Sequence, residues 1–278
     1  MTDCIIIGQG PAGISAAMYV CRAGFSAAVI RHGESALEKA HKIENYYGLQ
    51  KPVSGRELLS IGERQAADFG AVFIEAEVTG LSGMGPFEVH TENGEYIAKT
   101  LIIATGKPHR KPPIGGLAEL EGRGVSYCAV CDGFFYKGKT VGVLGAGAYA
   151  AAEASHLAGL CGVVIVYTNG EEPTADFPDG VKTDRREISR VTERGNALSL
   201  VFKNNEQEKL DGLFVAVGTA SAVDFAAKLG IITKDGSIPT GDDQMTNVRG
   251  VFAAGDCTGG LCQVATAVGQ GAAAGTGA

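Results

Sequence analysis

The stretch Asp3–Gly13 (DCIIIGQGPAG) predicts how the chain begins to fold. Its apolar first half is typical of a buried strand, and the small residues of Ile14–Ala23 are typical of a helix. The turn between them reads G-x-G-x-x-G in the strand–turn–helix context of a dinucleotide site. Gly8 permits the tight turn, Gly10 lets the backbone approach a pyrophosphate, and Gly13 lets helix and strand pack closely. The helix N-terminus would offer amides and a positive dipole end to the phosphates.

An acidic residue near the end of the next strand often binds the ribose hydroxyls of a dinucleotide. We expect that strand at Ala27–Ile30, and the residues after it are Arg31-His32-Gly33-Glu34. Glu34 is therefore the candidate, a few residues later than usual.

A second strand-turn-helix unit begins at Thr140 and carries Gly145, Gly147 and Ala150 in a G-x-G-x-x-A turn. Thr168–Gly170, after its next strand, provides neither an acid for a ribose nor arginines for a 2′-phosphate. An acidic loop that would repel a phosphate replaces the expected helix; its acids are Glu171, Glu172, Asp176 and Asp179. Two interpretations stay open: a working nucleotide site, or a relic retained for helix–strand packing.

Between these units lies Ser126–Phe135 (SYCAVCDGFF), in which Cys128 and Cys131 are three positions apart and Asp132 follows directly. The spacing allows a small disulfide ring, and a helix beginning here would stabilise a thiolate. Asp132 is placed to exchange a proton with a thiol. The alternatives are two buried cysteines or half of a zinc site, completed on count alone by Cys257 and Cys262.

Composition limits the class of protein. The chain has 278 residues, enough for about two domains, and 45% of them are hydrophobic, as in a globular protein. The net charge of −7 argues against nucleic-acid binding. No apolar run is long enough to cross a membrane and no signal peptide is visible. Seven scattered cysteines do not resemble a secreted disulfide framework, so we expect a cytoplasmic protein.

The last predicted strand ends in a carboxylate. Gly250–Asp256 (GVFAAGD) precedes a small-residue helix from Gln263 to Gly269. A carboxylate at a strand end can accept hydrogen bonds from flavin ribityl hydroxyls, and amides at a helix start can stabilise charge on a reduced flavin ring. Upstream, the basic, proline-rich segment Lys107–Pro113 reads as an interdomain linker and holds the densest basic cluster, a candidate docking patch for an acidic partner. That cluster comprises Lys107, His109, Arg110 and Lys111.

These motifs occur in the order seen in low-molecular-weight thioredoxin reductases, which the chain resembles over nearly its whole length. They are GQGPAG at Gly8–Gly13, IENYYG at Ile43–Gly48, IIATG at Ile102–Gly106, CAVCDGFF, and VFAAGD with Gln263-Val264-Ala265. The resemblance implies an α/β fold with two Rossmann-like domains of the three-layer ββα type, the second inserted in the first. Residues 1–110 and 211–278 would form an FAD-binding domain, and residues 111–210 the disulfide-bearing insert with a degenerate NADPH-type fold.

The resemblance also implies roles for individual residues. Cys131 would lie nearest the flavin, Cys128 would attack the disulfide of thioredoxin, and Asp132 would be the acid–base residue. The resemblance implies a homodimer and implies no metal site. The residues implied for FAD binding are Gly8, Gly10, Pro11, Ala12, Gly13, Glu34, Asn45, Ala104, Thr105, Gly106, Gly255, Asp256, Gln263, Val264 and Ala265.

The chain departs from the family pattern in two places. The Gly-Gly-Gln element before the IEN-type loop is missing, with Ala36–Glu38 near its place. The NADPH-binding arginines are also missing, and Arg185 and Arg186 are the nearest candidates. This loss resembles the ferredoxin-dependent flavin thioredoxin reductases, which implies ferredoxin as a partner and electron donor. The alternatives are an NAD(P)H-dependent reductase of the same fold, using the Gly145 turn, and a flavin redox sensor without turnover.

Overall fold

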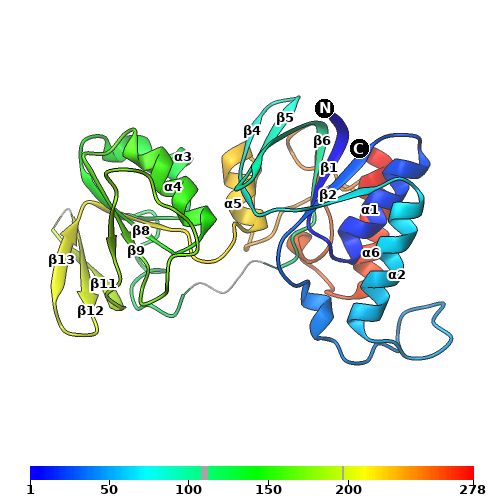
Figure 1. Ribbon diagram of the computed structural model, residues 1–278, viewed down its shortest axis with the longest axis horizontal. Coiled ribbons are helices and arrows are strands. Elements are labelled where there is room, and N and C mark those ends of the chain that lie inside the picture. Colours follow the sequence, from blue (N-terminus) through cyan, green and yellow to red (C-terminus); the bar gives the residue numbers. More distant parts are fainter. Residues whose placement is uncertain (108–111, 196) are drawn as a thin grey trace. The chain divides into compact units, whose positions relative to one another are not determined.

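The computed structural model describes residues 1–107, 112–195 and 197–278 and divides into two compact units (Figure 1). Unit 1 comprises Met1–Pro108 and Ser221–Ala278, and unit 2 comprises His109–Ala220. The predicted basic cluster falls largely outside the described residues, because His109, Arg110 and Lys111 are not among them. Among the described residues, no helix is long and apolar enough to cross a membrane.

Unit 1 is built on a sheet whose parallel part has the order β3-β2-β1-β6, with β15 pairing β6 on the other side. Two further strands, β5 and β4, extend the sheet from β6 as an antiparallel meander. The strands are β1 (Thr2–Ile7), β2 (Ala27–Arg31), β3 (Val72–Glu75), β4 (Val78–Gly83), β5 (Phe87–Thr91), β6 (Gly94–Ile103) and β15 (Val251–Ala253).

The helices of unit 1 include α1 (Pro11–Arg22), α2 (Gly55–Asp68) and α6 (Val264–Gly277), which lie together in Figure 1. Helices α1 and α6 approach closely because α6 presents glycines. A Cβ on Gly271 would stand 2.1 Å from the carbonyl oxygen of Ala12, and one on Gly275 would stand 2.4 Å from that of Ala16. The small residues of both segments therefore bring the start of α6 beside the first glycine turn.

Strand β6 corrects one expectation. The sequence favours two strands, Tyr96–Ala98 in the meander and a separate buried strand in Lys99–Gly106. The structure has one continuous strand, Gly94–Ile103, that pairs antiparallel with β5 and parallel with β1. The two segments merge because no turn residue separates Ala98 from Lys99.

Unit 2 has three layers: helix α4, a parallel five-stranded sheet and an antiparallel three-stranded sheet. The parallel order is β10-β9-β8-β14-β7, and the second sheet has the order β11-β12-β13. One apolar core joins residues of both sheets, including Leu144, Leu213 and Leu200. The elements are β7 (Val125–Ser126), β8 (Thr140–Leu144), α4 (Ala148–Ala158), β9 (Val163–Tyr167), β10 (Lys182–Asp184), β11 (Ile188–Arg194), β12 (Ala197–Phe202), β13 (Gln207–Leu210) and β14 (Gly212–Val215).

The chain leaves unit 2 later than the expected boundary at residues 210 and 211. Strand β14 (Gly212–Val215) pairs with β8 and β7, so it belongs to the sheet of unit 2. The unit ends at Ala220, and the next helix, α5 (Ala222–Leu229), contacts β4 of unit 1. The apolar run Leu213–Val217 is thus the last strand of the insert.

Candidate active site

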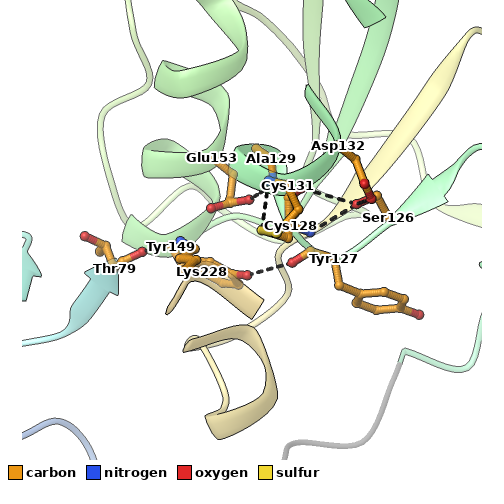
Figure 2. The surroundings of a disulfide bond; sticks show 10 residues. All are labelled: Thr79, Ser126, Tyr127, Cys128, Ala129, Cys131, Asp132, Tyr149, Glu153 and Lys228. Atoms are coloured by element: carbon orange, nitrogen blue, oxygen red, sulfur yellow. Dashed lines mark hydrogen bonds between the residues drawn. A yellow bond between two sulfur atoms is a disulfide. The ribbon is translucent and has the colours of Figure 1, made fainter. Parts of the chain in front are cut away.

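Cys128 and Cys131 form a disulfide directly after β7, with 5.4 Å between their Cα atoms (Figure 2). Cys128 caps the short helix α3 (Ala129–Asp132), and its Sγ accepts a hydrogen bond of 3.2 Å from the amide of Cys131. The two cysteines differ in exposure, because Cys128 is buried and Cys131 is exposed. The spacing therefore brings the pair together, with one sulfur more accessible than the other.

Asp132 is hydrogen-bonded, through Ser126 of β7, to the turn that carries the disulfide, Tyr127–Asp132, which is called the redox turn below. The hydroxyl of Ser126 donates to Asp132 Oδ2 at 2.7 Å, and the amide of Cys128 donates to the same hydroxyl at 3.1 Å. The Asp132 carboxylate is thus linked to the backbone of Cys128 by two successive hydrogen bonds through the Ser126 hydroxyl. Sequence reasoning missed Ser126, although its position two residues before Cys128 suits a side chain that hydrogen-bonds to the local backbone.

Helix α4 contributes two further side chains that sequence reasoning missed. Glu153, 3% exposed, accepts a hydrogen bond of 2.6 Å from the amide of Ala129, and Tyr149 donates to the carbonyl oxygen of Tyr127 at 3.2 Å (Figure 2). The signal in the sequence was a lone acid inside an alanine-rich helix, four residues after a tyrosine. Residues at that spacing share one helix face.

An exposed apolar surface lies next to the disulfide in sequence. Val130 of α3 and both phenylalanines of the following short helix η2 (Gly133–Tyr136) are exposed, Phe134 by 71% and Phe135 by 69%. Exposed aromatic side chains grouped in this way are typical of a surface that binds another protein.

The first glycine turn fits the pyrophosphate of a dinucleotide. Gly8 has φ +114°, and a Cβ there would stand 2.3 Å from the carbonyl oxygen of Ala104; one on Gly13 would stand 1.9 Å from that of Gly8. A Cβ on Gly10 would meet only the hydroxyl of Ser35, at 3.9 Å. Gly10 is also the N-cap of α1 and offers no side chain to the first amides, and Pro11 follows it. Gly8 and Gly13 therefore allow close backbone packing within the turn, and Gly10 leaves the outer side of the turn open.

Two strand ends place further predicted residues beside this turn. Ala104 donates from its amide to Ile7 O at 2.8 Å, and Ala254 donates to Ile103 O at 3.0 Å. The hydroxyl oxygen of Thr105 is buried and has no hydrogen-bond partner among the described residues. A buried hydroxyl without a partner is costly, so it fits a bound group that would complete its hydrogen bonding. Gly106, next in the chain, has φ +74°.

The last predicted residues gather at the start of α6. Asn45 Nδ2 donates to Gln263 Oε1 at 3.1 Å, which joins the IENYYG loop to the residue that caps α6. Val264 and Ala265 form the first turn of that helix. Gly255, with φ +85°, donates to Gln270 of α6 at 2.8 Å, and Asp256 begins the short helix η3 (Asp256–Thr258).

Glu34 lies outside this group of contacts. Its carboxylate is exposed and pairs with Arg56 at 2.8 Å. The residue at the end of β2 is Arg31, which pairs with Glu63 and Glu75, both at 3.1 Å. The missing Gly-Gly-Gln element is replaced by a short helix, η1 (Ala36–Lys39), capped by Ser35.

The second glycine turn is hydrogen-bonded to the acidic loop of its own unit. Thr174 donates from its amide to the carbonyl oxygen of Ala146 at 2.8 Å, and a Cβ on Gly147 would stand 3.4 Å from the Thr174 hydroxyl. A Cβ on Gly145 would stand 2.1 Å from Ala216 O and 2.9 Å from the Cβ of Ala150. Gly145 and Ala150 are therefore explained by packing, without any ligand.

The two arginines considered for a 2′-phosphate are paired with carboxylates. Arg185 pairs with Glu172 of the acidic loop. Arg186 binds Asp184 and Glu208, bonds to Glu206 at 2.8 Å, and lies 3.9 Å from the ring centre of Phe202. Hydrogen bonding to Asp184 raises the pKa of Arg186, and the same bond lowers the pKa of Asp184.

The other cysteines are free thiols: Cys4, Cys21, Cys161, Cys257 and Cys262. Burial raises the pKa of Cys257 to about 12, so it is an inert packing residue near neutral pH. The alternative of a zinc site finds no support, since both sulfurs of Cys128 and Cys131 are in a disulfide. No group of three or more His, Cys, Asp or Glu side chains that could hold a metal ion occurs within residues 1–107, 112–195 and 197–278.

A dinucleotide turn and a redox disulfide on one chain define a class, the pyridine nucleotide-disulphide oxidoreductases. The model of that family matches residues 2–271, and the chain belongs to it. Within the family, the chain is similar to thioredoxin reductases, which confirms the resemblance read from the motifs. The thioredoxin reductase of Aquifex aeolicus is 37% identical over 274 residues, covering 91% of this chain and 84% of that one.

Two solved structures extend the similarity. The atypical thioredoxin reductase TRi from Desulfovibrio vulgaris Hildenborough is 41% identical, with a TM-score of 0.93 over 99% of this chain and 96% of that one. A ferredoxin-flavin thioredoxin reductase from Clostridium acetobutylicum is 31% identical, with a TM-score of 0.72 over 99% and 95%. These relatives confirm the α/β fold with Rossmann-like domains and FAD as the cofactor.

Proposed function

We propose that the protein is an FAD-dependent thioredoxin reductase that reduces thioredoxin through the Cys128–Cys131 disulfide. The observation that carries the proposal is the formed disulfide, held beside a carboxylate, on a chain whose other unit fits a dinucleotide. The relatives' names supply the substrate, thioredoxin. The exposed side chains of Val130, Phe134 and Phe135 form a docking surface next to the disulfide.

Bound FAD supplies the electron pair that reduces the disulfide. Residues of the first glycine turn, from Gly8 to Gly13, would hold the pyrophosphate, and Thr105 would hydrogen-bond to the cofactor. Asn45, Asp256 and Gln263 would lie nearer the ribityl chain and the ring. The remaining predicted ligands are Pro11, Ala12, Glu34, Ala104, Gly106, Gly255, Val264 and Ala265.

In the reduced enzyme, two electrons and two protons have converted the disulfide to two thiols. Asp132 would take the proton from Cys128, whose thiolate attacks one sulfur of the thioredoxin disulfide and forms a mixed disulfide. Cys131 then attacks Cys128 in that bond, which restores the enzyme disulfide and releases thioredoxin with two thiols. Cys128 is 5% exposed, so this sequence requires that its surroundings open before thioredoxin binds.

Two serine variants test this order of attack. In the Cys131→Ser variant, Cys128 should trap thioredoxin as a stable mixed disulfide, visible as a reducible band of higher mass. The Cys128→Ser variant should trap none and should lose thioredoxin reduction. Trapping by the second variant alone would reverse the roles of the two cysteines, and an active Cys128→Ser enzyme would refute the mechanism.

We further propose ferredoxin as the electron donor. The acidic loop is hydrogen-bonded to the second glycine turn through Thr174, and Arg185 and Arg186 are paired with carboxylates, which supports a turn without the arginines that a 2′-phosphate would need. Similarity to the ferredoxin-flavin thioredoxin reductase supports the same conclusion. Transfer is favourable, since plant-type ferredoxins lie near roughly −400 mV and thioredoxin near roughly −270 mV.

The donor is tested by anaerobic titration of the flavin absorbance. Reduced ferredoxin should bleach the flavin and, with thioredoxin present, release thioredoxin thiols at one per electron. NADPH and NADH should leave the spectrum unchanged over minutes. Rapid bleaching by either nucleotide would favour the second candidate, an NAD(P)H-dependent reductase that uses Gly145, Gly147 and Ala150.

Two further expectations and one alternative complete the proposal. A homodimer is supported by the resemblance alone. A cytoplasmic location is supported by free thiols at five positions among the described residues. A redox sensor without turnover is the remaining alternative, and steady-state reduction of thioredoxin over many enzyme equivalents would exclude it.

A further inference from the structure

One face of α4 meets the redox turn on both sides of Cys128. Tyr149 donates to the carbonyl oxygen of Tyr127, the residue before Cys128, and Glu153 accepts from the amide of Ala129, the residue after it. A Cβ on Gly133 would stand 3.2 Å from the side chain of Leu157, on the same helix. Three residues at four-residue spacing on α4 therefore lie against the disulfide segment, and Figure 2 shows the first two, Tyr149 and Glu153.

Glu153 accepts a hydrogen bond from the first amide of α3, next to Cys128. The first amides of α3 point toward the start of that helix, and amides there ordinarily favour a negative sulfur. The amide of Cys131 donates to Cys128 Sγ, but the amide of Ala129 donates to the Glu153 carboxylate instead. Because Glu153 is 3% exposed, water screens its charge poorly.

We propose that Glu153 is a positioning residue that fixes the redox turn through Ala129 and, by its negative charge, keeps the Cys128–Cys131 pair a strong reductant. The charge disfavours a thiolate nearby, so it destabilises the reduced form relative to the disulfide. A dithiol that is harder to form gives up its electrons more readily to thioredoxin. The proposal rests on the redox role of the pair in the proposed function.

Other titratable groups surround the turn and remain in place when Glu153 is changed. Asp132 of α3 carries a second carboxylate, bonded to Ser126 of β7. Tyr136 of η2 has its pKa raised by burial and by Asp132. His156 of α4 lies near Gly133, and its ring carbon would be 3.9 Å from a Cβ there. Two further titratable groups among the described residues are the phenols of Tyr127, within the turn, and of Tyr149 on α4.

The test measures the equilibrium constant for reduction of the Cys128–Cys131 disulfide in the full-length flavoprotein. The enzyme is equilibrated without oxygen in mixtures of reduced and oxidised dithiothreitol between pH 6 and pH 9. In this reaction the enzyme disulfide takes two electrons and two protons and becomes a dithiol, while reduced dithiothreitol becomes its cyclic disulfide. Alkylation and mass spectrometry of the peptide that contains Cys128 and Cys131 give the equilibrium constant.

Glu153→Gln keeps an oxygen for the Ala129 amide and removes the charge. We expect the equilibrium constant for reduction to rise about three- to tenfold in E153Q. The difference should be small at pH 6 and grow with pH, because only the thiolate form senses the charge. Glu193→Gln, which changes an exposed residue of β11 in the same unit, is the matched control and should follow the wild type.

Equal equilibrium constants for E153Q and E193Q at every pH would overturn the proposal. If Glu153 had a purely structural role, E153Q would keep the wild-type equilibrium constant. Glu153→Ala, which also removes the hydrogen-bond acceptor, would then lower the thermal stability and leave the equilibrium constant unchanged. Neither thioredoxin nor ferredoxin is present, so failure here is distinct from failure of the proposed function, which would show as a wild-type disulfide that does not cycle.

Discussion

Replacing Thr105 by valine tests whether a cofactor binds at the end of β6. The hydroxyl of Thr105 is buried without a partner among the described residues, and valine has the same shape without the hydroxyl. An unsatisfied buried polar group costs about 1–3 kcal/mol, so the apoprotein of T105V should be more stable than wild type by that amount. The hydrogen bond that FAD would form with Thr105 contributes about 0.5–1.5 kcal/mol.

Both effects weaken FAD binding in the variant. Their sum is about 1.5–4.5 kcal/mol, so the dissociation constant of FAD should rise at least about tenfold. The assays are urea unfolding of the deflavinated protein and the quenching of FAD fluorescence on binding. Thr100→Val, on β6 five residues earlier, is the matched control: its hydroxyl already donates to Asp3 O at 3.1 Å, so T100V should lose stability and keep its FAD affinity.

The result that refutes the reasoning is a T105V apoprotein no more stable than wild type together with unchanged FAD affinity. That outcome would mean that the Thr105 hydroxyl is satisfied in solution and does not contact the cofactor. A stabilised apoprotein with unchanged affinity would refute the cofactor contact alone.

Three other predictions follow from the same structure. The double variant Phe134→Ser and Phe135→Ser should raise KM for thioredoxin at least about tenfold and leave flavin reduction by ferredoxin unchanged. An unchanged KM would show that these side chains do not form the docking surface for thioredoxin. Cys257, with its pKa raised to about 12, should resist iodoacetamide at pH 8 in the folded enzyme and react after unfolding, as followed by mass spectrometry. Hydrogen bonds from Lys99 and Ser26 lower the pKa of Asp3, so its contribution to stability is complete above about pH 4 and lost as pH falls below. Acid titration of unfolding should show a smaller loss in Lys99→Met than in wild type; equal losses would contradict it.

Local signals predicted the parts of the fold that depend on neighbours in sequence. The turn at Gly8–Gly13 requires glycine for close backbone contacts within a few residues, and those contacts are present. The disulfide of Cys128 and Cys131 likewise depends on short spacing. The merged strand β6 and the late boundary at Ala220 were missed, because partners far away in the sequence, β1 for β6 and β8 for β14, help to decide them.

The parts of the site that could not be read from the sequence are contacts between distant segments. Glu153 is separated by 24 residues from the amide it binds, and Asn45 by 218 residues from Gln263. An acid in an alanine-rich helix is ordinarily solvated, so only packing reveals that Glu153 is buried. The pairing of Arg186 with Glu206 and Glu208, 20 and 22 residues away, likewise depends on segments that meet in the folded unit.

Under the proposed ferredoxin dependence, the second glycine turn explains why a nucleotide-type unit persists without binding a nucleotide. Gly145 and Ala150 are required by the carbonyl oxygen of Ala216 and by helix–strand packing, so substitution there would disrupt β8 and α4 whether or not a nucleotide binds. The same helix carries Glu153, which bonds to the redox turn. Loss of α4 would therefore remove a support of the disulfide. Loss of the nucleotide-binding arginines and gain of an acidic loop would leave that support in place. The motif alone thus indicates a fold, and under the proposed function the residues around it determine whether a nicotinamide nucleotide can donate electrons.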